Sequence, residues 1–144
     1  MIAQHVLLAC GPFGATPPPS VAAALTRGLL AAGAPEPDVL ELPGADVAPA
    51  ALTALLADAG FDARLRASRA LIVASERLDE ATLAGSPAFE LATRARQAGV
   101  PAYAVTAADR LNEFDVRILD LQAVIEADGT RRLAAAGRRI AALV

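Results

Sequence analysis

The sequence contains no lysine, no tryptophan and only one cysteine in 144 residues. All 13 basic residues are therefore arginines, and no lysine is present to form a Schiff base or to hold a phosphate group. The single cysteine, Cys10, cannot form a disulfide within the chain, which is typical of a protein from a reducing compartment. We therefore expect a cytoplasmic protein.

Aromatic residues make up only 3% of the chain, and the formal net charge is −3. Nucleic-acid binding usually needs a basic surface and often needs stacking rings, so this class of partner is disfavoured. Uninterrupted apolar runs of roughly 18 residues, which a membrane-spanning helix requires, do not occur. The opening stretch MIAQHVLLACGPFG has no basic region before its apolar run, and it predicts a first core strand rather than a signal peptide.

Apolar runs alternate with helical patterns along the chain, which is typical of βαβ units on a parallel sheet. With 55% hydrophobic residues and a length typical of one domain, residues 1–144 are expected to form a single packed domain. The predicted fold class is α/β: a three-layer α/β/α Rossmann-like domain with a mostly parallel sheet of about five strands. The predicted strands cover residues 5–10, 38–43, 70–74, 101–106 and 121–127.

Four helices are predicted, at residues 21–33, 48–60, 86–99 and 129–144. Glycines at the ends of the first three suit helix C-termini, and Ser86 followed by Pro87 suits a helix start. Residues 61–68 are predicted as a short turn that leads into the third strand.

Three loops follow predicted strands, at the edge of the sheet where parallel α/β proteins usually bind ligands. These loops cover residues 10–20, 42–49 and 74–85. In the first loop, Gly11, Gly14 and Thr16 precede a helix, so backbone N–H groups could approach an anion there. The alternative interpretation of this loop is a tight turn stiffened by its three consecutive prolines.

The other two loops carry acidic and basic residues. In the second loop, Asp46 could bind a metal or a substrate hydroxyl, or it could cap the following helix. In the third loop, Arg77 offers a planar fork for a carboxylate or phosphate, and Glu76 and Asp79 offer oxygen ligands of the kind Mg²⁺ accepts. The alternative is that Arg77 pairs with its acidic neighbours and that Asp79 caps a short turn.

Cys10 follows the first strand, but the chain offers it only His5 as a possible partner, and His5 lies on the same predicted strand. We therefore expect Cys10 to be a small buried side chain rather than a nucleophile. A lone histidine does not make a metal site, so no metal site is assigned.

The third loop and its surroundings, ALIVASERLDEATLAGSP, resemble the bacterial glycerate kinase family that carries a Gly-Glu-Gly-Arg-(Leu/Ile)-Asp motif after a strand. The matching positions are Glu76, Arg77, Leu78, Asp79, Thr82 and Gly85. The stretches ARQAGVPAYAVTA and DLQAVIEA resemble the family's last two strands. In the N-terminal half, Ala9, Phe13, Thr16 and Asp46 match more faintly. The resemblance implies a ligand-binding role for Glu76, Arg77, Asp79 and Thr82, and more weakly for Thr16 and Asp46. Gly11 and Gly14 remain candidates for ligand binding because their backbone N–H groups could approach an anion.

The sequence departs from this family at positions that matter for phosphoryl transfer. Where the family has lysines, this chain has Gly14 in the first loop and Ser86 after the motif. The family's second domain, which supplies the other wall of its active-site cleft, has no counterpart between the two halves of this sequence. Phosphoryl transfer relies on positioning and on cations that neutralise the moving group, so efficient kinase chemistry is not expected.

Three hypotheses follow from the sequence. The first is a kinase-related domain that is not a competent kinase and binds a small anionic ligand, a hydroxy acid or phosphate, around Arg77. The second is a minimal glycerate kinase completed by self-association or by a partner, and only this case requires Mg²⁺ and ATP. The third is an interaction module that uses a face exposed by the loss of the second domain, with a homodimer as the expected assembly.

Overall fold

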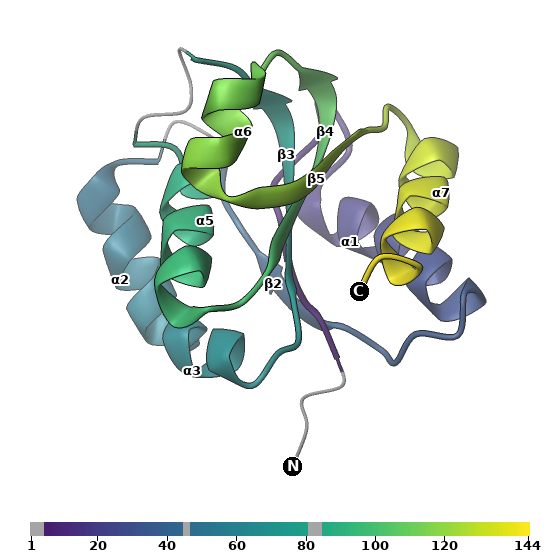
Figure 1. Cartoon of the computed structure of the whole chain (residues 1–144), viewed down its shortest axis with the longest axis horizontal. Coiled ribbons are helices and arrows are strands. Elements are labelled where there is room, and N and C mark those ends of the chain that lie inside the picture. Colours follow the sequence, from purple (N-terminus) through teal and green to yellow (C-terminus); the bar gives the residue numbers. More distant parts are fainter. Residues whose placement is uncertain (1–4, 45–46, 81–84) are drawn as a thin grey trace.

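The computed structural model of the chain describes residues 5–44, 47–80 and 85–144, and it has a three-layer α/β Rossmann-like fold (Figure 1). The five strands are β1 (Leu7–Cys10), β2 (Asp38–Glu41), β3 (Leu71–Leu78), β4 (Ala102–Asp109) and β5 (Leu121–Glu126). They form one sheet in the order β2-β1-β3-β4-β5, and every pair of neighbouring strands is parallel. The predicted fold class is confirmed.

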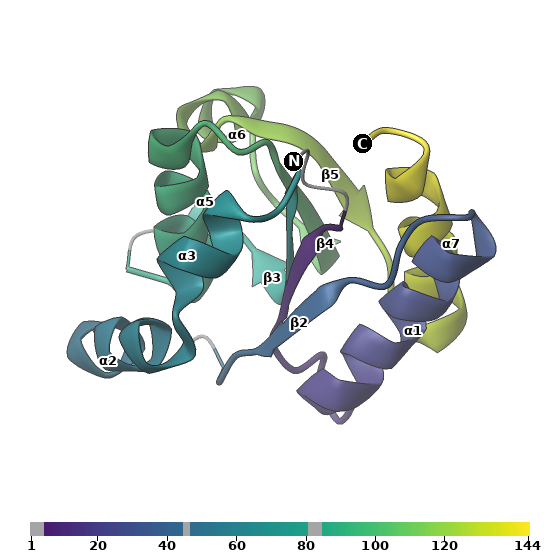
Figure 2. The same cartoon turned by 90° about the horizontal axis from the view of Figure 1, so that it is seen from below.

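Helices cover both faces of the sheet, as Figure 2 shows from below. The helices are α1 (Pro18–Ala31), α2 (Pro49–Ala59), α3 (Phe61–Arg66), α5 (Pro87–Ala98), α6 (Glu113–Leu119) and α7 (Thr130–Ala141). α1 and α7 cover one face, and α2, α3, α5 and α6 cover the other. None of the described helices is long and apolar enough to span a membrane.

Two hydrophobic cores, one on each face, hold the layers together. The side chains of β1 alternate between them: Leu8 and Cys10 belong to the core under α1 and α7, and Leu7 and Ala9 belong to the core on the opposite face. All four are fully buried. A parallel sheet covered on both faces requires such a continuous apolar run, which explains why HVLLAC is recognisable as a strand.

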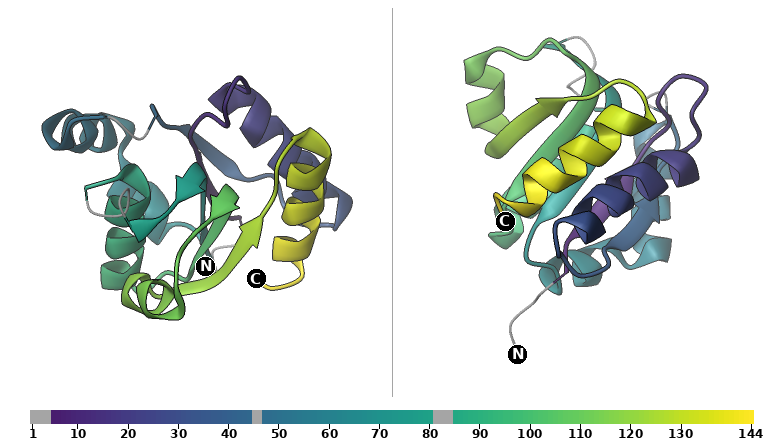
Figure 3. Two further views of the ribbon diagram at one scale, coloured as in Figure 1. Left: turned by 90° about the horizontal axis from the view of Figure 1, so that it is seen from above. Right: turned by 90° about the vertical axis from the view of Figure 1, so that its right-hand side faces the viewer.

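α1 and α7 pack side by side on their face of the sheet, as Figure 3 shows. Their close contact depends on Gly28 and Gly137. A Cβ atom added at Gly28 would lie 1.9 Å from the carbonyl oxygen of Ala134, and one added at Gly137 would lie 2.4 Å from the carbonyl oxygen of Leu25. Only glycine allows the two backbones to approach this closely.

The largest differences between the structure and the sequence-based expectations concern two helices and the ends of two strands. The segment 61–68 was predicted as a turn, but residues 61–66 form α3, in which Phe61 and Leu65 are buried. The helix α6 was not predicted at all. The third and fourth strands were predicted to end at residues 74 and 106, but β3 continues to Leu78 and β4 continues to Asp109. The two strands pair along this extension, with Arg77 opposite Ala108.

Candidate functional site

A pocket of about 310 Å³ lies at the carboxyl ends of β1, β2 and β3. Its volume falls at the lower end of the range for small-molecule sites. Its walls come from the loop after β1, the loop after β2, the end of β3 and the first turn of α5. The residues that bear on its chemistry are Gly11, Pro12, Gly44, Glu76, Arg77 and Ala88.

The sheet topology explains why a pocket forms here. The chain leaves β1 through α1 and moves outward to β2, whereas it leaves β3 through α5 and moves in the opposite direction to β4. α1 and α5 lie on opposite faces of the sheet, so the loops after β1 and β3 diverge and leave a crevice between them. This is the topological switch point, where doubly wound α/β proteins commonly bind ligands.

Gly11 and Gly14 meet the end of β3 in different ways. The backbone N–H of Gly11 donates a 2.9 Å hydrogen bond to the carbonyl oxygen of Ala74, which fixes the start of the loop to β3. Gly14 has a left-handed backbone conformation (φ +56°), and a Cβ atom there would lie 3.4 Å from Oε1 of Glu76. The structure therefore brings the first and third predicted loops together.

The first loop is also a tight turn, as its alternative interpretation proposed. Phe13 and Thr16 exchange two backbone hydrogen bonds of 2.9 and 2.8 Å across this turn. Phe13 is buried in the core beneath α1, which anchors the turn. The backbone amide of Thr16 is thus occupied within the loop itself, and Thr16 does not line the pocket.

Glu76 and Arg77 are neighbours on β3 and both line the pocket. The Arg77 side chain is 66% exposed, and its Nε lies 3.9 Å from Oδ2 of Asp79. This is a long, exposed ion pair, of the kind that contributes little stability. The guanidinium is therefore accessible to a ligand as well as to Asp79.

The first turn of α5 forms another wall of the pocket. The predicted start of this helix is confirmed: Ser86 is the N-cap, its Oγ accepts a 3.2 Å hydrogen bond from the backbone N–H of Phe89, and Pro87 follows. Pro87 and Ala88 line the pocket, so the positive end of the helix dipole faces it. Together with Arg77, this helix end makes the pocket favourable for an anionic group.

Thr106 is a positioning residue that the sequence analysis did not single out. It is fully buried on β4, and its hydroxyl donates a 3.0 Å hydrogen bond to the carbonyl oxygen of Glu76. It also accepts a 3.3 Å hydrogen bond from the backbone N–H of Ala108. Thr106 thus fixes the ends of β3 and β4 behind the pocket. Its only signal in the sequence is that it directly follows the apolar run PAYAV.

Cys10 is fully buried at the end of β1. Burial, together with the nearby charge of Glu41, raises the pKa of the thiol from 9.0 to about 12. A thiol that remains protonated is a poor nucleophile, so Cys10 is a core side chain.

Within residues 5–44, 47–80 and 85–144, no three His, Cys, Asp or Glu side chains group together in a way that could hold a metal ion. The predicted site residues Asp46 and Thr82 lie outside these described ranges.

The fold and pocket together define a doubly wound α/β domain with a small-molecule-sized crevice at its topological switch point. No family model and no curated protein matches the sequence. Among solved structures, the chain is similar to one described as a "putative pilus assembly-related protein" from Burkholderia pseudomallei K96243. The TM-score is 0.54 and the identity 22%, and the match covers 97% of this chain and 90% of that chain. At this identity the similarity shows the fold alone.

Proposed function

We propose that this protein is a glycerate-kinase-related domain that binds a small anionic ligand, a hydroxy acid or a phosphate, in the pocket at the carboxyl ends of β1 and β3. The observation that carries the proposal is the position of Arg77, which lines the pocket with a largely exposed guanidinium. A planar guanidinium binds a carboxylate or phosphate through two parallel hydrogen bonds. The N-terminus of α5, which also lines the pocket, adds to the attraction for the same group.

We further propose that the domain is not a competent kinase. Phosphoryl transfer needs several cationic groups around the moving phosphate, and the chain has no lysine to supply them. The described lining of the pocket instead includes one arginine, Arg77, and one carboxylate, that of Glu76. This combination supports binding and orientation of a ligand better than transfer of a phosphoryl group.

The test is isothermal titration calorimetry, in which the purified protein is titrated with phosphate, D-glycerate and related hydroxy acids. Charge-assisted hydrogen bonds contribute about 1.5–3 kcal/mol, so Arg77→Ala should weaken binding roughly 10- to 100-fold. The matched control is Arg110→Ala, which removes an exposed arginine after β4 that does not line the pocket. Affinity that is unchanged in Arg77→Ala, or equally reduced in both variants, would contradict the proposed site. ATP-dependent phosphorylation of glycerate by the wild-type protein would contradict the non-kinase assignment.

A further inference from the structure

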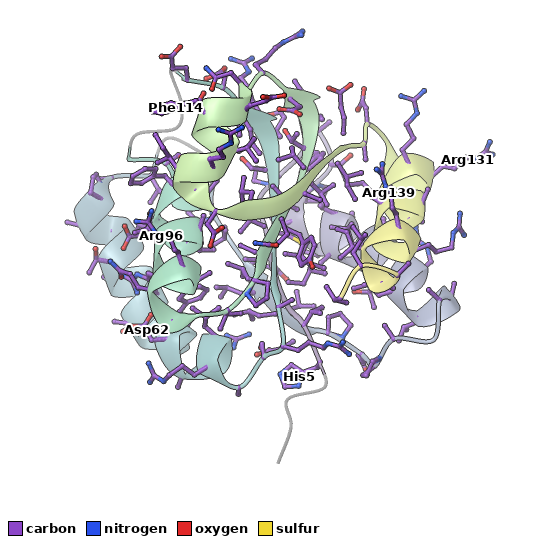
Figure 4. All side chains as sticks on the ribbon, viewed as in Figure 1. His5, Asp62, Arg96, Phe114, Arg131 and Arg139 are labelled. Carbon is purple, nitrogen blue, oxygen red and sulfur yellow. The ribbon has the colours of Figure 1, made fainter. Side chains whose placement is uncertain are left out.

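α6 exposes two large apolar side chains on the outside of the molecule. Phe114 is 68% exposed and Ile118 is 44% exposed, and Figure 4 labels Phe114 on this helix. The two residues are four positions apart, so they lie on the same face of α6 one turn from each other. A neighbouring face of the helix packs against the protein interior, because Asp115 and Leu119 are buried.

Two charged residues flank these apolar side chains. Glu113 precedes Phe114, Arg117 precedes Ile118, and both charged side chains are exposed. Four ion pairs are found among the described residues, and neither Glu113 nor Arg117 takes part in any of them. We call Glu113, Phe114, Arg117 and Ile118 the α6 strip. It has an acid near the helix N-terminus, a base near the C-terminus, and an apolar residue next to each.

The order of these residues makes the strip complementary to itself. A twofold axis perpendicular to α6 would place a second copy of the helix antiparallel to the first. Glu113 of one copy then faces Arg117 of the other, and Phe114 faces Ile118, with each pair occurring twice. Such a contact, in which the same patch is used by both subunits, is the commonest kind in homo-oligomers.

We propose that the α6 strip is a dimerisation surface on which a second copy of this chain docks with twofold symmetry. The charge pattern favours a second copy over an unrelated partner. The strip carries one charge of each sign, so a purely acidic partner would repel Glu113 and a purely basic partner would repel Arg117. The proposal is independent of the anion pocket, because none of the four residues lines it.

The size of the strip sets the expected affinity. α6 has seven residues and is about 10 Å long, so the contact belongs to the class of small interfaces that bury less than about 1,200 Å² in total. Such interfaces are typical of weak, transient association. We therefore expect a dimer that dissociates on dilution, with a dissociation constant in the range of about 1 μM to 1 mM.

The first experiment is sedimentation velocity over a concentration series from the micromolar to the millimolar range. The wild-type protein should shift from monomer to dimer, and Phe114→Glu should remain monomeric over the whole series. Leu30→Glu is the matched control: Leu30 is 48% exposed but lies on α1, on the other face of the sheet, so this variant should dimerise like the wild type. A wild-type protein that stays monomeric up to 1 mM would overturn the proposal.

The second experiment tests the twofold pairing itself by charge reversal. Glu113→Arg alone and Arg117→Glu alone each bring like charges together across the axis, so each variant should be monomeric. An equimolar mixture of the two should form a heterodimer, because one variant then presents two basic side chains and the other presents two acidic ones. The double variant should recover the homodimer. Because the four positions are exposed, circular dichroism should show all variants folded. A mixture that stays monomeric while the wild type dimerises would overturn the assigned geometry.

Discussion

The hydroxyl of Thr106 donates a 3.0 Å hydrogen bond to the carbonyl oxygen of Glu76, and this contact joins β4 to β3 immediately behind the pocket. Thr106 is fully buried, so a substitution that removes the hydroxyl deletes a side-chain hydrogen bond from the interior to the backbone of β3.

Replacing Thr106 with valine keeps the shape of the side chain but removes its hydrogen bonds. We expect a loss of about 0.5–1.5 kcal/mol in the free energy of unfolding, the usual net contribution of an intramolecular hydrogen bond. Anion binding should weaken as well, because the backbone next to Arg77 is less firmly held. Urea denaturation measures the first effect and calorimetry the second. Thr106→Ser retains the hydroxyl and should stay closer to the wild type in both; equal losses in the two variants would contradict this role.

Replacing Gly28 or Gly137 with alanine should strongly destabilise the protein. In an exposed helix the same change is favourable by about 1 kcal/mol, because alanine has the higher helix propensity. Here the added methyl group would collide with backbone atoms of the facing helix, so we expect a net loss of at least 1–3 kcal/mol. Thermal unfolding of Arg27→Ala, an exposed neighbour on α1, provides the control and should change by less than about 0.5 kcal/mol. An increase in stability on alanine substitution would rule out the close helix contact.

Cys10 should make stability fall at high pH. The pKa of its thiol is raised from 9.0 to about 12 by burial, so above pH 9 the unfolded chain loses a proton that the folded chain keeps. Ionisation then favours the unfolded state, and the stability contributed by the neutral thiol is lost between pH 9 and 12 at up to about 1.4 kcal/mol per pH unit. The measurement is urea denaturation of wild type and Cys10→Ala between pH 8 and 10.5. The stability difference between the two proteins should shrink as pH rises, and a constant difference would contradict the prediction.

Asp38 and Arg64 form a bidentate ion pair that connects α3 to the edge strand β2. Nε of Arg64 lies 2.9 Å from Oδ2 of Asp38, and Nη2 lies 2.7 Å from Oδ1. The hydrogen bonds from Arg64 lower the pKa of the Asp38 carboxyl below 3.8. The stabilisation is therefore present above pH 3.8 and is lost as pH falls through the depressed folded-state pKa. Both side chains are partly exposed, so Asp38→Asn should cost only about 1 kcal/mol at pH 7. This cost should shrink as pH falls below 3.8 and the Asp38 carboxylate of the folded protein becomes protonated, and a cost that does not change with pH would argue against an ionic contribution.

The elements that the sequence predicted correctly are those in which local pattern and tertiary environment agree. Leu71–Ala74 form a continuous apolar run because both faces of β3 are covered there. From Ser75 to Arg77 the same strand extends past this cover, where charged side chains reach solvent, and the composition therefore resembles a loop. Pairing with β4 maintains the extended backbone in this segment. Because β4 lies about 30 residues further along the chain, the local sequence of residues 75–77 does not show that this pairing occurs.

α6 was missed for a related reason. It begins with a regular cap, in which the Asn112 side chain accepts a 2.8 Å hydrogen bond from the backbone N–H of Asp115. However, it is short, it buries an aspartate, and it exposes Phe114 and Ile118, so its polar and apolar residues do not follow the usual amphipathic pattern. The same irregularity is the basis for the dimerisation surface proposed above.

The candidate site could be predicted only in part. Gly11, Glu76 and Arg77 line the pocket, because residues at the ends of neighbouring parallel strands necessarily meet at one edge of the sheet. The contributions of the α5 N-terminus and of Thr106 were not recognised, because they depend on how the loops fold back across that edge and on which strand pairs with which.

The contact between Gly28 and Gly137 joins segments that are far apart in the order of synthesis. α1 is translated before most of the sheet, but α7, which packs against the backbone of α1 at Gly28, is the last described element to leave the ribosome. Until then, Leu25 and Leu29 lack part of their final packing partners. The nascent chain should therefore have an incomplete core on this face, and complete folding should wait for residues near 141 to emerge.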